Sequence, residues 1–279
     1  MSLFAFGLGY SAARVIARGG FSAAAGTVRD PGALEAWRRQ GVAAHLFGDP
    51  GAADLAGAEI ALVSIPPDAE GDPTLRAYRP ALRVRRAVYL STVGVYGDAG
   101  GAWVDEDSPT PALSPRARAR VAAEAAWMTF GREAGVAFDI LRLGGIYGPG
   151  RSAFDRLREG KARRVVKPGQ VFNRIHVDDI AAAVETVASA GRPGAIYNVV
   201  DGDPSPPEAM IECAAALIGA PPPPHEPFAS AGLTGMALSF YEENRRVRNA
   251  RLRGLGWTPR YPSFREGLAA ILAEEGARH

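Results

Sequence analysis

The chain has 279 residues, of which 47% are apolar and 22% charged, and its formal net charge is +2. This length and composition favour one large α/β unit or two closely associated lobes, and they exclude a disordered chain. The near balance of charge, with arginines spread along the sequence, gives no indication of nucleic-acid binding.

Cysteine usage and the first residues bear on location. The single Cys213 excludes an intramolecular disulfide and a cysteine-based metal cluster, which favours a reducing compartment. The apolar residues 1–13 lack a preceding basic region, so we do not expect a signal peptide. No apolar run approaches the ~20 residues of a membrane span. We therefore expect a cytoplasmic protein that does not enter the membrane.

Short β-like runs alternate with helix-like segments through the first half of the chain. Strands are expected at 2–6, 21–28, 42–46, 59–65, 87–90 and 136–141, and helices at 11–18, 31–40, 73–82 and 115–132. Such alternation forms parallel βαβ units whose helices cover both faces of the sheet. The sequence therefore predicts an α/β fold, a doubly wound parallel sheet of the Rossmann type, with its ligand crevice at the carboxyl ends of the strands.

The alternation weakens after Gly150. Helices are expected at 152–159, 177–190, 207–218 and 263–275, a strand at 196–200, and an irregular basic segment at 163–174. No repeat or domain-sized linker is present. We expect a dinucleotide-binding core of residues 1–150, rejoined by 174–200, and a small C-terminal substrate lobe of residues 151–173 and 201–279.

The first predicted strand leads directly into Gly7-x-Gly9-x-x-Ala12 and then a helix. In this context the first glycine permits a tight turn, and the second lets the backbone approach a pyrophosphate. A small residue at the third position lets the helix pack closely on the strand. Free N–H groups at the helix start, around Tyr10 and Ser11, then face the negative charge. This segment predicts a dinucleotide site.

The end of the second strand bears on the choice of dinucleotide. Arg29 comes first after this strand, and a guanidinium suits the 2′-phosphate of NADP because its forked donors match phosphate oxygens. NADP is therefore the preferred cofactor. NAD stays possible because Asp30 follows, although this carboxylate is also suited to cap the helix that begins near Pro31.

Later segments are similar to those of a known family. Residues 90–97 (LSTVGVYG), 141–150 (LRLGGIYGPG), 174–179 (RIHVDD) and 196–199 (IYNV) resemble the motifs of extended short-chain dehydrogenases/reductases, the NAD-dependent epimerase/dehydratase family. The resemblance implies a Rossmann lobe that binds NAD(P), with a small lobe over the nicotinamide. It also implies a small-molecule substrate, either a nucleotide sugar or a related carbonyl or alcohol compound, and often a homodimer.

The resemblance also implies roles for individual residues. Thr92 falls where the family has its catalytic Ser/Thr, which hydrogen-bonds the reacting oxygen. Ser64, Ile65 and Pro66, at the end of the fourth strand, fall where the family's backbone lines the cofactor.

The chain departs from the family at its Tyr-x-x-x-Lys pair. The aligned segment places Arg116 at the tyrosine and Arg120 at the lysine. Arginine stays protonated, so Arg116 is unable to act as the proton donor and acceptor. The spacing leaves it as a candidate anchor for an anionic substrate group, while Arg120 is expected to hold a cofactor ribose or phosphate.

Other side chains are candidates for the missing proton donor. Tyr147 and Tyr96 lie in motifs that the resemblance places near the substrate, but a packing role is the favoured interpretation for each of them. His176 has a suitable pKa range, yet it precedes an acidic helix start and is expected to satisfy local backbone. The resemblance places the acidic residues 105–107 in a surface loop, and without a second cluster no metal site is expected. The basic run 245–251 is suited either to a nucleotide-sugar phosphate or to a solvated helical face.

The sequence thus predicts an NAD(P)-binding oxidoreductase, epimerase or dehydratase with an atypical active site. The alternative is a non-catalytic regulatory protein that senses NADP(H), which accounts for the missing tyrosine.

Overall fold

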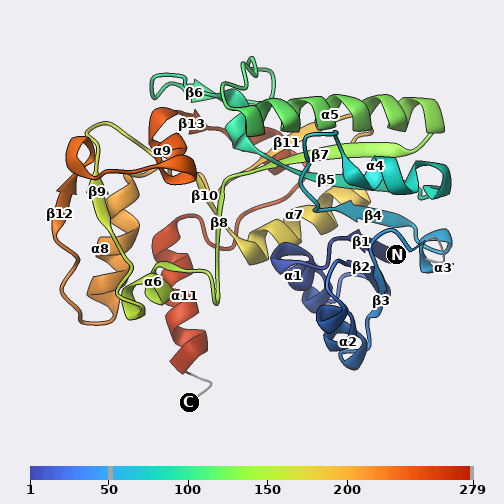
Figure 1. Cartoon of the computed structure of the whole chain (residues 1–279), viewed down its shortest axis with the longest axis horizontal. Coiled ribbons are helices and arrows are strands. Elements are labelled where there is room, and N and C mark those ends of the chain that lie inside the picture. Colours follow the sequence, from blue (N-terminus) through green and yellow to red (C-terminus); the bar gives the residue numbers. More distant parts are fainter. Residues whose placement is uncertain (50–52, 277–279) are drawn as a thin grey trace.

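The computed structural model describes residues 1–49 and 53–276, and within them seven parallel strands form one central sheet (Figure 1). From one edge to the other these are β3 (Ala43–Leu46), β2 (Ala23–Val28), β1 (Ser2–Phe6), β4 (Ile60–Val63), β5 (Arg86–Thr92), β7 (Ala137–Leu143) and β11 (Ile196–Val199). Strand order reverses between β1 and β4, which is the ligand-binding switch point of doubly wound sheets. The predicted fold class is confirmed, and β11 rejoins the sheet as expected.

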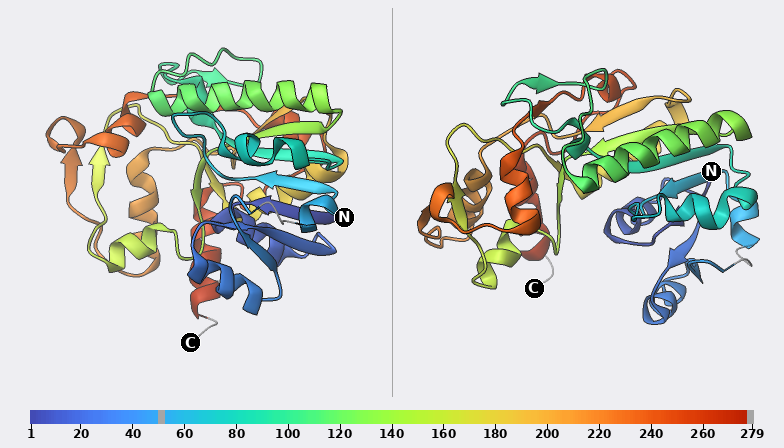
Figure 2. Two further views of the ribbon diagram at one scale, coloured as in Figure 1. Left: turned by 45° about the vertical axis from the view of Figure 1, so that its right-hand side comes forward. Right: turned by 45° about the horizontal axis from the view of Figure 1, so that its top comes forward.

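Helices cover both faces of this sheet (Figure 2). One face carries α1 (Tyr10–Arg18), α2 (Pro31–Arg39) and α7 (Val177–Ala190), and the other carries α3 (Ala53–Ala56), α4 (Pro73–Tyr78), the 3₁₀ turn η1 (Arg79–Ala81) and α5 (Pro115–Ala134). Successive side chains of β1 point to opposite faces of the sheet. Leu3 and Ala5 pack in the hydrophobic core under the first helical layer, and Phe4 and Phe6 pack in the core under the second. Strands apolar on both faces are what a sheet between two helical layers requires.

A second group of elements lies beside the carboxyl edge of the sheet, to the left in Figure 1. It comprises α6 (Ala153–Arg158), α8 (Pro207–Leu217), the 3₁₀ turn η3 (Phe228–Ser230), α9 (Gly235–Glu242), and the paired strands β9 (Arg164–Val166) and β12 (His225–Pro227). Helix α11 (Phe264–Gly276) packs with α6 and α8 around Phe154, Phe264 and Leu268.

The remaining elements are short. They are the 3₁₀ turn η2 (Val93–Tyr96), α10 (Ala250–Arg253), the pair β8 (Gly145–Tyr147) and β10 (Arg174–His176), and the pair β6 (Trp103–Val104) and β13 (Arg246–Val247). Across the described ranges, every helix is too short or too polar to traverse a bilayer.

One expectation for the second half is wrong, and one helix was not anticipated. The segment 163–174 is not irregular, because it contains β9 and begins β10, and α9 is the helix that was missed. Strands of two or three residues are formed by pairing with distant segments, as β9 pairs with β12, so they leave no local periodicity. Helix α9 begins with a glycine and has no buried residue, so it lacks an apolar stripe to detect.

Asp201, just after β11, is a buried carboxyl group. It is 3% exposed, its Oδ1 accepts a hydrogen bond from the Asp203 N–H (3.1 Å), and its Oδ2 is buried without a partner among the described residues. Burial penalises the charged form and raises the pKa of Asp201 to about 7. Burial also raises the pKa of Asp139 and of Asp179 to about 6.

These raised pKa values predict that stability falls as the pH rises. An acid that binds its proton more tightly when folded stabilises the fold fully below its unfolded pKa and loses that contribution through the folded pKa. For Asp201 the loss between pH 4 and pH 7 is on the order of 3–4 kcal/mol. Urea unfolding at pH 4.5 and pH 8 should show this slope in the wild type and a clearly smaller one in Asp201→Asn. Asp203→Asn is the control, and an unchanged slope in Asp201→Asn would contradict the assignment.

Candidate functional site

The turn between β1 and α1 is held from three directions. Gly7 has φ of 92°, in the left-handed region that favours glycine, and the Gly9 N–H donates to the Gly7 carbonyl (2.8 Å). The Gly7 N–H donates to Thr27 Oγ1 on β2 (3.1 Å). Ser64 Oγ, just after β4, donates to the Gly7 carbonyl (2.7 Å). The turn is therefore fixed by the two strands that flank β1.

The two glycines serve different purposes. A Cβ atom at Gly7 would lie 2.8 Å from Ser64 Oγ and 2.9 Å from Ile65 Cγ1, so the turn is closed on that side. A Cβ atom at Gly9 would meet nothing within 4 Å. Helix α1 begins after Gly9 with no side chain capping its N–H groups, and Ala12 is fully buried. Open space beside an uncapped, positive helix start fits the diphosphate of a dinucleotide.

Tyr10 and Ser11 occupy the first turn of α1. The Tyr10 hydroxyl donates to the Pro149 carbonyl (3.1 Å), and the Arg151 guanidinium lies over its ring (5.6 Å). The Tyr10 side chain thus ties the phosphate turn to the loop after β8. Ser11 is 9% exposed, and its backbone N–H is one of the donors at the start of α1.

Arg29 and Asp30 differ in what they are free to do. The Asp30 side chain accepts a hydrogen bond from the Ala33 N–H (3.0 Å). Asp30 therefore caps α2, which is one of the two roles that the sequence predicted for it. Arg29 is exposed, and no hydrogen bond or ion pair to it occurs among the residues that the structure describes.

Thr92 ends β5 at the same carboxyl edge as the phosphate turn. Its Oγ1 accepts a hydrogen bond from the Gly94 N–H (3.1 Å) and thereby caps η2. The hydroxyl proton is left to donate elsewhere. Thr92 is partly exposed, which suits a group that hydrogen-bonds a substrate oxygen.

Tyr96 belongs to a buried polar network behind Thr92. Its hydroxyl donates to Asn198 Oδ1 (2.8 Å) and accepts from Arg142 Nη1 (3.0 Å). Arg142 forms an ion pair with Glu124 of α5 (2.7 Å), and Glu124 Oε1 accepts from the Ser91 hydroxyl (2.5 Å). Burial raises the pKa of Tyr96. With its hydroxyl fully engaged, Tyr96 holds η2 in place, and Arg142 is a core ion-pair member.

Tyr147 and His176 are likewise interior residues. Tyr147 is 3% exposed and packs against Gly267 of α11, and burial raises its pKa. His176 lies 5.2 Å from the Tyr147 ring, and its Nδ1 accepts from the Asp178 N–H (3.2 Å), as expected for a residue that satisfies local backbone. Burial lowers the pKa of His176 to about 4, so the ring is neutral. Neither residue is placed to exchange protons with solvent.

The two arginines on α5 are separated by the structure. Arg116 is exposed, and its Nη1 lies 3.4 Å from Met236 Sδ on α9. Arg120 is 8% exposed and points into the sheet, where its Nη1 donates to the Leu90 carbonyl (2.8 Å) and the Tyr89 hydroxyl (3.1 Å). These contacts anchor α5 on β5. A contact of Arg120 with a cofactor stays a prediction.

Two features near the site were missed by sequence reasoning. Glu106, in the acidic loop expected at the surface, is 8% exposed and accepts from the Asn198 N–H on the edge strand β11 (2.8 Å). Arg245, in a basic run expected either to meet a substrate phosphate or to be solvated, is 11% exposed, and its Nη2 lies 4.0 Å from the position that a Cβ atom would take at Gly94. Only tertiary contacts reveal either placement. No group of three metal-ligating side chains occurs in the described part of the chain.

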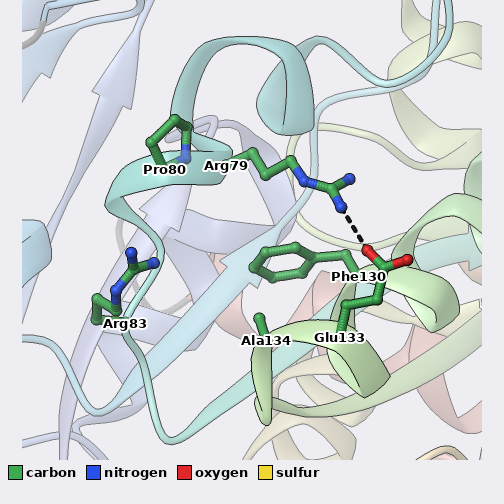
Figure 3. Close-up of a pocket in the computed structure, with 6 residues that line it drawn as sticks. All are labelled: Arg79, Pro80, Arg83, Phe130, Glu133 and Ala134. Atoms are coloured by element: carbon green, nitrogen blue, oxygen red, sulfur yellow. Dashed lines mark hydrogen bonds and ion pairs between the residues drawn. The ribbon is translucent and has the colours of Figure 1, made fainter.

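A hollow of about 470 Å³ lies between η1 and the end of α5 (Figure 3). It is lined by Arg79, Pro80, Arg83, Phe130, Glu133 and Ala134. These residues precede β5 and β7, so the hollow lies at the amino ends of the strands. Ligands of doubly wound sheets bind at the opposite edge, which is where the glycine turn and Thr92 lie.

Comparisons with known proteins agree with this geometry. A model of the NAD dependent epimerase/dehydratase family matches residues 68–200. The chain is 32% identical over 210 residues to a 3-diazoavenalumate denitrifying reductase from Streptomyces, which covers 71% of this chain and 69% of that protein. The chain belongs to the NAD-dependent epimerase/dehydratase family. The Rossmann core described above is the fold of this family, and the open turn at Gly9 is a candidate site for a nicotinamide dinucleotide.

Solved structures extend the comparison. A conserved protein of unknown function from Silicibacter pomeroyi is 44% identical, has a TM-score of 0.90, and covers 98% of both chains. A dTDP-glucose 4,6-dehydratase from Bacillus anthracis, solved in complex with NAD, has a TM-score of 0.78 at 17% identity over 96% of this chain and 94% of that one. At that identity the likeness shows the fold alone.

The different surroundings of Gly7 and Gly9 predict opposite outcomes for two alanine variants. Gly9→Ala should fold with an unfolding temperature close to that of the wild type and bind dinucleotide at least tenfold more weakly, because its methyl group enters the open space. Gly7→Ala should lower the unfolding temperature, because it combines a positive φ with a clash at Ser64. Calorimetry for binding and thermal melts for stability separate the two. Undiminished binding by Gly9→Ala would place the diphosphate elsewhere.

Proposed function

We propose that this protein is an NADP(H)-dependent reductase of a small carbonyl compound. The observation that carries the proposal is the open, uncapped turn at Gly9 on the same sheet edge as the free hydroxyl of Thr92. When bound, the dinucleotide supplies a hydride. The residues of the chain bind the cofactor, orient the acceptor and hold its oxygen.

The cofactor would be held mainly by backbone. The N–H groups at the start of α1, next to Gly9, Tyr10 and Ser11, would bind the diphosphate. The segment after β4, which includes Ser64, Ile65 and Pro66, would line the far side, since Ser64 and Ile65 already contact the turn.

The preference for NADP rests on Arg29. Its guanidinium is exposed and unengaged within the described ranges, whereas the competing Asp30 carboxylate is occupied in capping α2. A free fork of donors at the end of the second strand suits a phosphate on the adenosine ribose.

Titration of both dinucleotides into wild type and Arg29→Ala tests this preference. Loss of the charged hydrogen bonds should cost about 1.5–3 kcal/mol in NADP binding and little in NAD binding. Asp30→Ala is a matched control, which should weaken α2 without changing the ratio of the two affinities. An equal loss for both dinucleotides in Arg29→Ala would refute NADP selectivity.

The reaction is proposed to run as a reduction. Oxidation of an alcohol begins with loss of the hydroxyl proton, and neither Tyr96 nor Tyr147 is placed to accept it. Arg116 stays protonated at ordinary pH and is likewise unable to accept it. In the reduction the acceptor oxygen gains charge, which donors at the site stabilise, and takes a proton from water. The reverse oxidation would use the same groups, so the supply of NADPH would set the direction.

The acceptor is proposed to be small rather than a nucleotide sugar. Several basic side chains of the second group and of the short elements β13 and α10 are already engaged. Arg163 pairs with Glu226, Arg164 with Glu212, and Arg251 with Asp107, while Lys167 donates to the Tyr241 carbonyl and Arg246 to the Gly101 carbonyl. A diphosphate on the substrate would have to displace these contacts, at a cost that a small carbonyl compound does not incur.

Variants of the three hydroxyl groups test the proposed reaction. Thr92→Val, which keeps the shape, should lower the rate of NADPH oxidation with a panel of aldehydes, ketones and quinones by about 100-fold. Tyr147→Phe should change that rate less than fivefold. Tyr96→Phe should lower stability by about 1–3 kcal/mol, because it leaves buried partners unpaired, yet retain the rate of the folded fraction.

The same panel decides between enzyme and sensor. Tight NADPH binding with no oxidation by any acceptor, together with a change of shape on binding, would refute the reductase and favour the regulatory alternative. A rate lost in Tyr147→Phe but kept in Thr92→Val would refute the assignment of Thr92.

A further inference from the structure

Arg245 borders the same small volume as Thr92. The position that a Cβ atom would take at Gly94 is 3.3 Å from Thr92 Oγ1 and 4.0 Å from Arg245 Nη2. Gly94 lies in η2, which follows β5. Because Gly94 has no side chain, the space beside Thr92 Oγ1 and Arg245 Nη2 is left open. An acceptor oxygen near Gly94 is within reach of a hydroxyl and a guanidinium together.

The guanidinium of Arg245 is fixed on one side and free on the other. Its Nη1 donates to the Gly97 carbonyl (2.5 Å) and to Glu243 Oε2 (2.7 Å). The side chain is 11% exposed, and Nε is buried without a partner among the described residues. Nη2 likewise donates no hydrogen bond to any residue that the structure describes. An oriented N–H group therefore remains for a ligand.

The backbone before Arg245 is held as firmly. The preceding Asn244 accepts at Oδ1 from the Val171 N–H (3.1 Å) and donates from Nδ2 to the Gly169 carbonyl (2.9 Å). Its own N–H donates to Asp98 Oδ1 (2.8 Å), in the loop that follows η2. These bonds connect the segment after α9 to the loop that carries Gly94 and Gly97, so the position of Arg245 is set in advance of binding, as electrostatic catalysis requires.

We propose that Arg245 is a catalytic residue, which with Thr92 binds the acceptor oxygen and stabilises the negative charge that it gains. This inference rests on the proposed function. As hydride adds to the carbonyl carbon, the π pair of the C=O bond moves to oxygen, and a proton from water completes the alcohol. Arg245 remains protonated throughout and supplies charge but no proton. It takes over the charge-stabilising part of the missing phenol's role.

The test compares variants at position 245 in the full chain with NADPH and the best acceptor of the panel. Arg245→Met, which keeps the length without the charge, should lower kcat about 100-fold or more. Arg245→Lys, which keeps the charge without the fork, should lower it by an intermediate factor. The dissociation constant for NADPH should stay within twofold of that of the wild type in both.

Arg246→Met is the matched control. The Arg246 guanidinium donates a hydrogen bond to the Gly101 carbonyl instead, so this variant should leave kcat unchanged. Gly94→Ala places a methyl group 3.3 Å from Thr92 Oγ1 and 4.0 Å from Arg245 Nη2, in the space proposed for the acceptor oxygen, and should also lower kcat at least tenfold. This second variant keeps the test decisive if Arg245→Met fails to fold. A kcat within threefold of that of the wild type in Arg245→Met or in a folded Gly94→Ala, or an equal loss in Arg246→Met, would overturn the proposal.

Benzoate provides a readout other than activity, because its carboxylate is a stable anion of the right size for two donors. Calorimetric titration into the NADP⁺-saturated protein should show binding that Arg245→Met weakens at least tenfold and Arg246→Met does not. If NADP⁺ does not bind, the same titration applies to the protein alone. Benzoate bound through Arg245 without any NADPH oxidation would defeat the reductase but keep the anion site. Benzoate binding that is absent in the wild type or unaffected in Arg245→Met would overturn the anion site itself.

Discussion

The site depends on a sharp turn that leaves the first N–H groups of α1 without internal partners. The left-handed conformation of Gly7 makes the turn, and Thr27 and Ser64 hold it from the neighbouring strands. Uncapped donors at a helix start are costly unless water or an anion satisfies them. Because these donors open onto the space beside Gly9, where a side chain would meet nothing, the fold itself creates a position for negative charge.

The chemistry available at this edge is that of donors. In place of the family's phenol the chain has an exposed Arg116, and the tyrosines nearby are part of the interior. Tyr96 in particular is held between Asn198 and Arg142, where moving a proton would leave a buried charge. In the proposed reaction Thr92 and Arg245 hold an oxygen as it becomes negative, and neither removes a proton from it. The proposed site therefore lacks the base with which epimerisation and dehydration, both of which first oxidise an alcohol, would begin.

Sequence reasoning predicted the parts of the molecule that are encoded locally. The glycine turn, the alternation of strands and helices through residue 150, and helix α7 follow from backbone geometry and apolar periodicity, and the structure agrees. The features that the sequence did not predict depend on contacts between distant segments. Strand β9 exists because β12 pairs with it, Glu106 is buried because it bonds the edge strand at Asn198, and Arg245 approaches Thr92 because Asn244 bonds two separate loops. Residue type and spacing do not record such contacts. They showed that the phenol was missing, but they did not indicate Arg245, the residue proposed to stabilise charge in its place.

Following the hydride itself is the most direct test of the proposed reduction. NADPH carrying deuterium on both hydrogens of nicotinamide C4 would be incubated with the wild-type protein and the aldehydes and ketones of the panel, and the products analysed by mass spectrometry. The proposed reduction predicts one deuterium on the former carbonyl carbon of the reduced product and one equivalent of oxidised dinucleotide. Dinucleotide that binds at this edge of the sheet while no acceptor ever gains deuterium would contradict it.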